Sequence, residues 1–250
     1  SSDLKANTKK IFLQYVALAF LYILLWYLLP VMALILFLLV TAFHFGEIDW
    51  VGKKKNDRYA FIYFIIGFSW ILFLLSYHAA TALNIFSSIT RKNLGQEQLL
   101  SLAKIILPIS LSVLFGTYLL LFIGRKKFFS SPSQWYLSLM QTAILLALAM
   151  TTPLWIFFGF YFGIWHSLLS LDKIRTCFGL KFTLSDWLQL LKKALPFSVM
   201  AWIGILYFIF LTQKSSDANG ILSLVFIGLA VLTGPHLLVF TKMSKKQAVD

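Results

Sequence analysis

The chain has 250 residues, of which 60% are hydrophobic and only 12% are charged, and its mean hydropathy is +0.83. A water-soluble domain of this length buries only roughly 70–75% of the surface that its unfolded chain exposes, so it cannot hide this much apolar surface. The composition therefore excludes soluble globular, disordered and collagen-like proteins. It predicts an all-α bundle of membrane helices, forming a single integral-membrane domain over residues 1–250.

Net charge is +13, from 22 Lys and Arg against 9 Asp and Glu. In a membrane protein such an excess belongs in cytoplasmic loops, so we expect no nucleic-acid partner. The single cysteine, Cys177, excludes an intrachain disulfide and a metal site built from several cysteines. Because the chain begins with Ser1 rather than Met, we also expect that N-terminal sequence has been removed.

Eight apolar segments predict about eight spans. They cover 11–29, 31–48, 59–79, 99–124, 134–151, 153–171, 195–213 and 219–241. The run over 11–45 would be about 50 Å long as one helix, against a hydrocarbon core of ~30 Å. Pro30 in its middle predicts a break, and Pro153 predicts another between the fifth and sixth segments. Both breaks indicate tight hairpins, and Pro196 falls in the first turn of the seventh segment, where proline is tolerated.

An even number of spans places both termini on one side of the bilayer. On that arrangement 18 of the 22 basic residues lie on the side of the termini and 4 on the other. The positive-inside rule therefore predicts a multi-pass protein of the cell membrane with both termini in the cytoplasm.

Two loop regions show helical spacing. Within the basic loop predicted over 172–194, Leu184, Trp187, Leu188 and Leu191 recur at helical intervals. This pattern predicts a short amphipathic helix at the membrane interface, capped by Thr183 or Ser185. The stretch 81–98 is long enough for a second helix of this kind.

The four histidines are the most informative polar residues, because none lies in a polar loop. His44, His166 and His236 fall near the cytoplasmic ends of the second, sixth and eighth predicted spans. Three imidazoles at similar depth could converge on one iron, copper or zinc ion. The alternative is that each makes an ordinary hydrogen bond between helices or lies at the interface. For His78, on the opposite side, we favour the interfacial interpretation.

Two carboxylates follow His44 closely. Glu47 lies one helical turn away, so it could ligate a metal or orient the imidazole. The alternative is that the span ends here and its carboxylates pair with the lysines of 53–55. Both interpretations stay open for Glu47, whereas for Asp49 we favour pairing with lysine.

The segment around His166 is rich in aromatic residues. Tyr161 and Trp165 could line an apolar tunnel, although aromatic residues at a span end more often form an interfacial belt. Gly163, together with Gly159, indicates a close approach between helices. One turn beyond His166 stands Ser170, a poor metal ligand.

The eighth segment has its own signal. His236 follows Pro235, which frees a backbone carbonyl and kinks the predicted span at that point.

Four blocks together resemble the Brp/Blh family of integral-membrane β-carotene 15,15′-dioxygenases. Residues 44–49 (His-Phe-Gly-Glu-Ile-Asp) resemble the second histidine motif of that family. Residues 161–167 resemble its Tyr-Phe-x-x-Trp-His-Ser motif, and 226–236 resemble its last span. The stretch 77–86 fits a loop of the family, and the blocks occur in the same order.

The resemblance implies a non-haem Fe²⁺ cofactor that uses O₂ to cleave the central double bond of β-carotene, giving retinal. By position, His44 and His166 match iron ligands, and His236 takes a weaker ligand role. Glu47, Tyr161 and Trp165 would support these ligands.

Two departures from the family pattern leave alternatives open. No histidine motif precedes residue 44, and Ser170 replaces the second histidine of a His-x-x-x-His pair. The chain could therefore be a catalytically inactive carotenoid- or retinal-binding homologue. A small membrane transporter is the third interpretation, but it predicts acidic residues in mid-membrane, and none of the nine Asp and Glu lies centrally in a predicted span.

Overall fold

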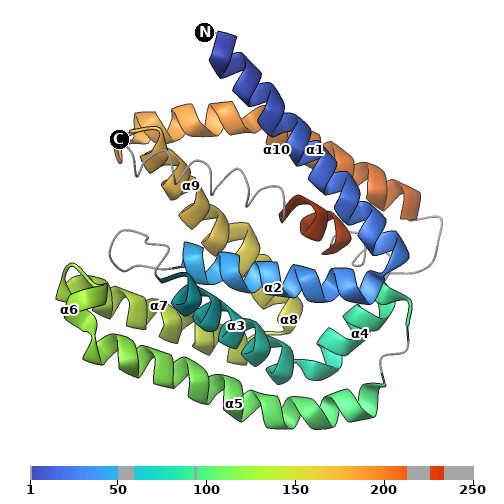
Figure 1. Cartoon of the computed structure of the whole chain (residues 1–250), viewed down its shortest axis with the longest axis vertical. Coiled ribbons are helices and arrows are strands. Elements are labelled where there is room, and N and C mark those ends of the chain that lie inside the picture. The colour runs from blue at the N-terminus through green and yellow to red at the C-terminus, as the bar shows by residue number, and fades with distance from the viewer. Residues whose placement is uncertain (1, 50–58, 93–94, 213–225, 234–250) are drawn as a thin grey trace. The chain divides into compact units, whose positions relative to one another are not determined.

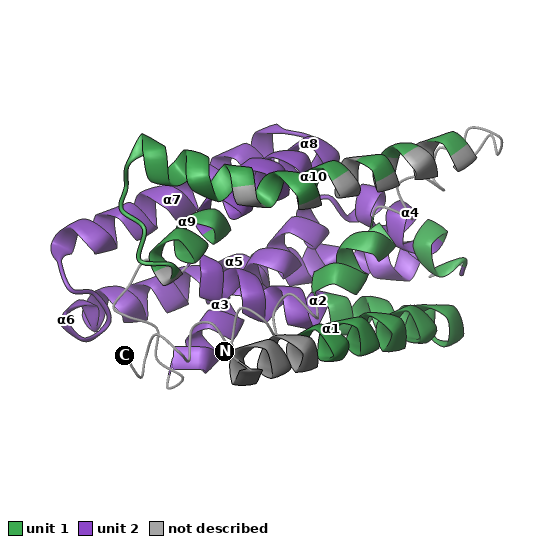
Figure 2. Cartoon of the chain, turned by 90° about the horizontal axis from the view of Figure 1, so that it is seen from above, with its two compact units in different colours: residues 1–37, 88–91, 170–250 green, residues 38–87, 92–169 purple. Residues whose placement is uncertain are grey.

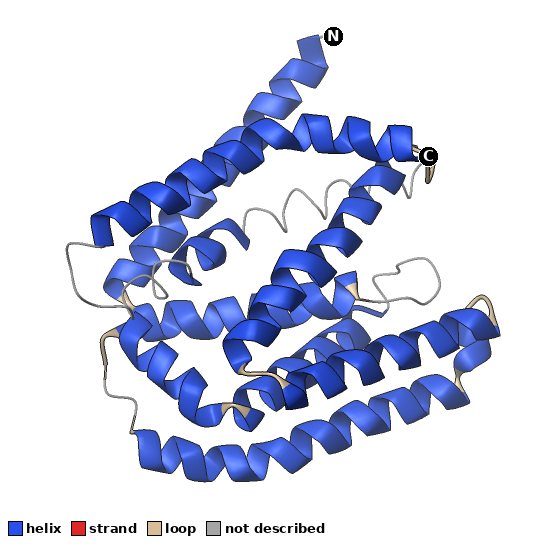
Figure 3. Cartoon of the chain, turned by 180° about the vertical axis from the view of Figure 1, so that it is seen from behind, coloured by secondary structure: helices blue, strands red, loops and turns tan. Residues whose placement is uncertain are grey.

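The computed structural model describes residues 2–49, 59–92, 95–212 and 226–233, and within these ranges it contains helices and no strand (Figure 3). The all-α prediction is therefore confirmed for the described part of the chain. The helices, of which Figure 1 labels all but η2, are α1 (Ser2–Leu28), α2 (Pro30–Ile48), α3 (Ala60–Tyr77), α4 (Ala79–Thr90), α5 (Gln96–Ile123), α6 (Arg125–Phe128), α7 (Pro132–Thr151), α8 (Leu154–Phe160), η2 (Tyr161–His166), α9 (Ser167–Cys177) and α10 (Leu184–Thr212).

Within the described residues, four helical stretches are long and apolar enough to cross a bilayer: Pro30–Ile48, Ala60–Tyr77, Gln96–Ile123 and Leu154–Thr176. They correspond to the second, third, fourth and sixth predicted segments. The total of about eight spans and the cytoplasmic position of both termini remain predictions. Most of the eighth segment, 219–241, lies outside the described residues, of which only 226–233 are seen to be helical.

Both proline breaks are confirmed. Helix α1 ends at Leu28 and α2 begins at Pro30, and the Tyr22 hydroxyl donates to the Ala33 carbonyl over 2.8 Å across this break. This bond ties the end of α1 to the start of α2, as a tight turn requires. Between α7 and α8, Thr152 and Pro153 adopt extended ψ angles of 151° and 148°, which interrupt the helix.

The predicted loop over 172–194 is wrong in extent. Helix α9 continues to Cys177, and α10 begins at Leu184, so the amphipathic segment forms the first turns of a long helix. Thr183 is the cap, because the Asp186 amide donates to its hydroxyl over 3.2 Å. Pro196 consequently lies inside α10 rather than in its first turn. No residue between Thr183 and Pro196 breaks a helix, so the helix that starts at the Thr183 cap continues through all of them. The second expected amphipathic helix, over 81–98, is present as α4 but begins and ends earlier.

A single arginine closes the short loop before α10. The guanidinium of Arg175 bonds the Asp172 carboxylate over 2.7 and 2.8 Å, and it also donates to the Leu180 carbonyl over 2.7 Å. Its cationic carbon lies 5.2 Å from the centroid of the Phe182 ring. These contacts turn the chain within six residues and so shorten the predicted loop.

The chain divides into two compact units, coloured separately in Figure 2. The first comprises Ser1–Phe37, Ser88–Arg91 and Ser170–Asp250, and the second comprises Leu38–Ser87 and Lys92–Leu169. The prediction of one integral-membrane domain stays a prediction. Two of the candidate site histidines, His44 and His166, belong to the second unit.

Two glycines set the packing of α2 against α3 in the second unit. A Cβ on Gly46 would overlap the Tyr63 carbonyl, and a Cβ on Gly67 would overlap the Ala42 carbonyl. The two helix backbones therefore touch directly, as small residues allow in membrane bundles. This contact fixes the depth and rotation of the turn of α2 that carries His44.

Two apolar clusters complete the second unit. The first joins α3, α5 and α7 through Ile66, Leu114, Leu121 and Trp135. The second joins α3, α7, α8 and η2, and its fully or nearly buried members are Phe73, Leu145, Ala149, Phe157 and Tyr161. The second cluster lies directly against the histidine-bearing segment η2.

We expect Gly46→Ala to destabilise the protein by about 2 kcal/mol or more, because the new methyl group must separate two backbones that are in contact. Chemical unfolding in detergent micelles measures this. The matched control is Gly116→Ala in α5, where nothing in the described structure lies within 4 Å of an added Cβ. That variant should be neutral or slightly more stable, and equal stability of both variants would contradict the assigned contact.

Candidate functional site

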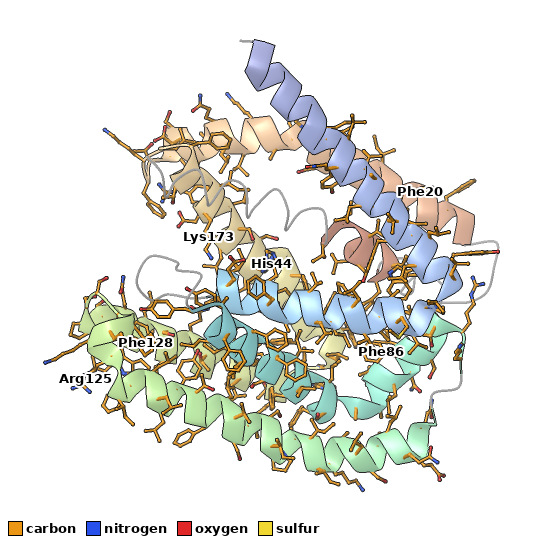
Figure 4. The ribbon with its side chains drawn as sticks, viewed as in Figure 1. Phe20, His44, Phe86, Arg125, Phe128 and Lys173 are labelled. Carbon is orange, nitrogen blue, oxygen red and sulfur yellow. The ribbon has the colours of Figure 1, made fainter. Side chains whose placement is uncertain are left out.

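Two of the predicted site histidines lie side by side. His44 is in the last turns of α2, labelled in Figure 4, and His166 ends η2. Their ring centroids are 5.1 Å apart, and the ring planes are inclined by 69°. The side chain of His44 is buried, with 2% of the residue exposed. His44 therefore lies inside the second unit, and the half-buried His166 lies beside it.

His166 owes its direction to a π-helical turn. Residues five apart in an α-helix point about 140° away from each other, but the wider π turn nearly superimposes them. Tyr161 and His166, at the two ends of η2, accordingly share a face, with ring centroids 6.1 Å apart. The hydroxyl of Ser167 donates to the Phe162 carbonyl over 2.6 Å, so this carbonyl in the irregular turn has a side-chain partner.

Phe45 fills the space between the two helices. Its ring centroid lies 5.0 Å from that of Tyr161, 5.1 Å from that of Phe162 and 5.3 Å from that of His166. Trp165 is half-buried and packs on the same cluster. The interfacial-belt interpretation is therefore wrong for Tyr161, which is 7% exposed and lies inside the unit.

Asp49 has a partner that the sequence did not reveal. Tyr161 donates its hydroxyl proton to the Asp49 carboxylate over 2.5 Å. We had favoured pairing with Lys53, Lys54 or Lys55, which lie outside the described residues. Glu47 is buried, with 5% exposed, on the same turn of α2 as His44.

His78 hydrogen-bonds the end of another helix, and its interfacial position stays a prediction. Its Nε2 hydrogen-bonds the Ala149 carbonyl over 2.9 Å, and the neighbouring Tyr77 hydroxyl donates to the Met150 carbonyl over 3.0 Å. Both carbonyls belong to the last turn of α7, where the helix offers them no amide partner. His78 therefore caps α7 and is separate from the His44–His166 pair.

Of the remaining sequence candidates, His236 and Pro235 lie outside the described residues. Ser170 is one turn beyond His166, in α9. The expected close approach at Gly159 and Gly163 is wrong, since no described atom lies within 4 Å of an added Cβ at either position. In the second unit Gly46 and Gly67 make that approach instead.

Comparison with known proteins decides the family. Residues 4–244 match the family described as beta-carotene 15,15'-dioxygenase. The chain belongs to this family of carotenoid dioxygenases. A curated relative from an uncultured marine bacterium, named beta-carotene 15,15'-dioxygenase, is 29% identical over 238 residues, covering 94% of this chain and 80% of the relative. No solved structure matches. The resemblance inferred from the four sequence blocks is thus confirmed.

The spacing of the histidine pair is compatible with a shared metal. Two imidazoles whose nitrogens lie about 2.1 Å from one ion place their centroids roughly 4.6–5.3 Å apart at bond angles near 90–110°. The observed 5.1 Å falls in that interval. Within the described ranges no group of three or more His, Cys, Asp or Glu is placed to hold a metal. The pair therefore fits as part of a metal site that needs at least one further donor.

We expect His78→Ala to lower the free energy of unfolding by about 1–3 kcal/mol, because the Ala149 carbonyl loses its partner. Unfolding in detergent measures the loss. Tyr77→Phe is the control, since it removes a bond made by a residue that is 39% exposed and should cost less. Wild-type stability of His78→Ala would contradict the capping role.

Proposed function

We propose that this chain is a multi-pass, Fe²⁺-dependent dioxygenase of the cell membrane that cleaves the central double bond of β-carotene into two molecules of retinal. Membership of the family supports the substrate class. The observation that carries the proposal is the pair of imidazoles from two different helices, with ring centroids 5.1 Å apart, of which His44 is buried and His166 half-buried.

His44 and His166 would hold the iron, with His236 as a weaker further donor and Glu47 supporting a ligand. Neutral imidazole is a suitable ligand for iron, and a site with few protein ligands leaves coordination positions open. When bound, the iron supplies the activation of O₂.

The surrounding aromatic side chains would bind the polyene and exclude water. Phe45 and Phe162 pack directly on the His166 ring, at 5.3 and 6.0 Å between centroids. A conjugated hydrocarbon gains contact area on such rings without leaving polar groups unsatisfied. Since β-carotene dissolves in the hydrocarbon of a bilayer, a membrane-embedded site meets it without extracting it into water.

The overall reaction is balanced without another reactant. The central C=C bond is broken, and each of its carbons forms a C=O bond to one atom of O₂. Both oxygen atoms are therefore accounted for in two aldehydes, and no external reductant is consumed.

Expression in bacteria that make β-carotene tests the proposal. We expect retinal to accumulate with the wild-type chain and the purified protein to contain iron. His44→Ala and His166→Ala should each lower retinal formation by at least about 100-fold, more than the roughly 10–100-fold expected for a residue that only supports a ligand.

The matched control is His78→Gln, which removes a different imidazole but can still donate to the Ala149 carbonyl. It should keep near wild-type retinal formation. Wild-type retinal formation by either His44→Ala or His166→Ala would contradict the assigned metal site.

A second variant addresses the missing family histidine. Ser170→His restores a histidine four residues after His166, on the following helical turn, and we expect it to raise iron affinity and retinal yield. Iron content and retinal are measured side by side with wild type. Should Ser170→His make retinal while the wild-type chain makes none, the chain is the catalytically inactive, carotenoid- or retinal-binding alternative. A transporter would make no retinal in either form.

A further inference from the structure

Asp49 joins three elements of the second unit at one point. Its amide donates to the Phe45 carbonyl over 2.9 Å, which continues the last turn of α2. Its backbone carbonyl accepts from the Gln141 side chain of α7 over 3.5 Å, and its carboxylate accepts from Tyr161 of η2 over 2.5 Å. The end of α2 is thus tied to α7 and to η2 together.

The burial of the residues that bond Asp49 argues against an incidental contact. Tyr161 is 7% exposed and Gln141 is 8% exposed, so these two partners of the half-buried Asp49 are inside the unit. Buried polar groups are costly unless they are hydrogen-bonded, so this contact satisfies a need of the buried Tyr161 hydroxyl. A hydrogen bond to a charged acceptor is also shorter and more directional than one between neutral groups.

The bond acts directly on the segment that carries His166. Tyr161 begins η2 and His166 ends it, and the π turn puts both on one face. At the end of α2, Asp49 follows His44 by five residues. Phe45, next to His44 in the sequence, packs against the rings of Tyr161 and His166. A shift of the Tyr161 hydroxyl away from Asp49 would therefore rotate or translate His166 relative to His44.

We propose that Asp49 and Tyr161 form a positioning pair, which holds the His166 imidazole at the distance from His44 that a shared metal requires. The pair touches neither substrate nor metal and acts through η2. Its use in catalysis rests on the function proposed above, whereas its effect on the spacing of residues 44 and 166 does not.

A metal-free experiment tests the spacing itself. His44→Cys and His166→Cys are introduced together with Cys177→Ser, and the rate of cross-linking by a short bifunctional thiol reagent is measured in detergent. Adding Tyr161→Phe or Asp49→Ala should slow the reaction several-fold. Asp49→Asn, which keeps an acceptor oxygen, should restore most of the rate.

The double variant shows whether the two residues act together. If they form one pair, Tyr161→Phe combined with Asp49→Ala slows cross-linking no more than either alone. Tyr77→Phe is the control, because it removes a hydroxyl bond of the same unit at the Met150 carbonyl. Wild-type rates in Tyr161→Phe and Asp49→Ala, or additive effects, would overturn the proposal.

A second readout uses the intact histidines. Titration with Co²⁺, followed by visible absorption, should show affinity about 10–100-fold weaker in Tyr161→Phe and Asp49→Ala, as is typical when a ligand loses its support. Tyr77→Phe should bind like wild type, and unchanged affinity in the first two variants counts against the positioning pair. If the wild-type chain binds no Co²⁺, the proposed iron function fails, and the cross-linking rates still decide whether the pair positions residue 166.

Discussion

Lipid offers no hydrogen-bond partners, so a polar side chain on a membrane helix must find its partner within the protein, on its own helix or on another. This constraint organises the second unit. His78 bonds the end of α7, Asp49 bonds Tyr161, and His44 packs beside His166. Each of these contacts joins segments far apart in sequence. These polar contacts therefore help to specify which helices are neighbours, while the apolar residues supply the general packing of the bundle.

The site depends on two departures from regular helix packing. Gly46 lets the backbone of α2 touch α3, which places the turn carrying His44 at a set depth. The π turn of η2 then moves Tyr161 onto the face of His166. Irregular turns of this kind cost stability and recur at functional sites. In this chain the irregular turn carries His166, Tyr161 and two further aromatic residues, Phe162 and Trp165.

Several site residues were predictable, and others were not. His44 and His166 stood out because imidazoles are rare at membrane depth. Both also lie in short family motifs that occur in the same order along the chain as in the family. Tyr161 looked interfacial because aromatic residues at a span end often form an interfacial belt, whereas the structure buries it beside His166. Asp49 looked like a partner for the adjacent lysines because sequence shows near neighbours, whereas its bond to Tyr161 spans 112 residues.

By itself the sequence determined the class of protein, the helix breaks at Pro30 and Pro153, and the histidines that could matter. These follow from hydropathy, proline geometry and composition, which are properties of local stretches of chain. Only the tertiary structure decided that His44 meets His166, that His78 caps α7, and that Gly46 rather than Gly163 is a point of close contact. Those outcomes depend on helix rotation and register, which side chains distant in sequence set together by packing.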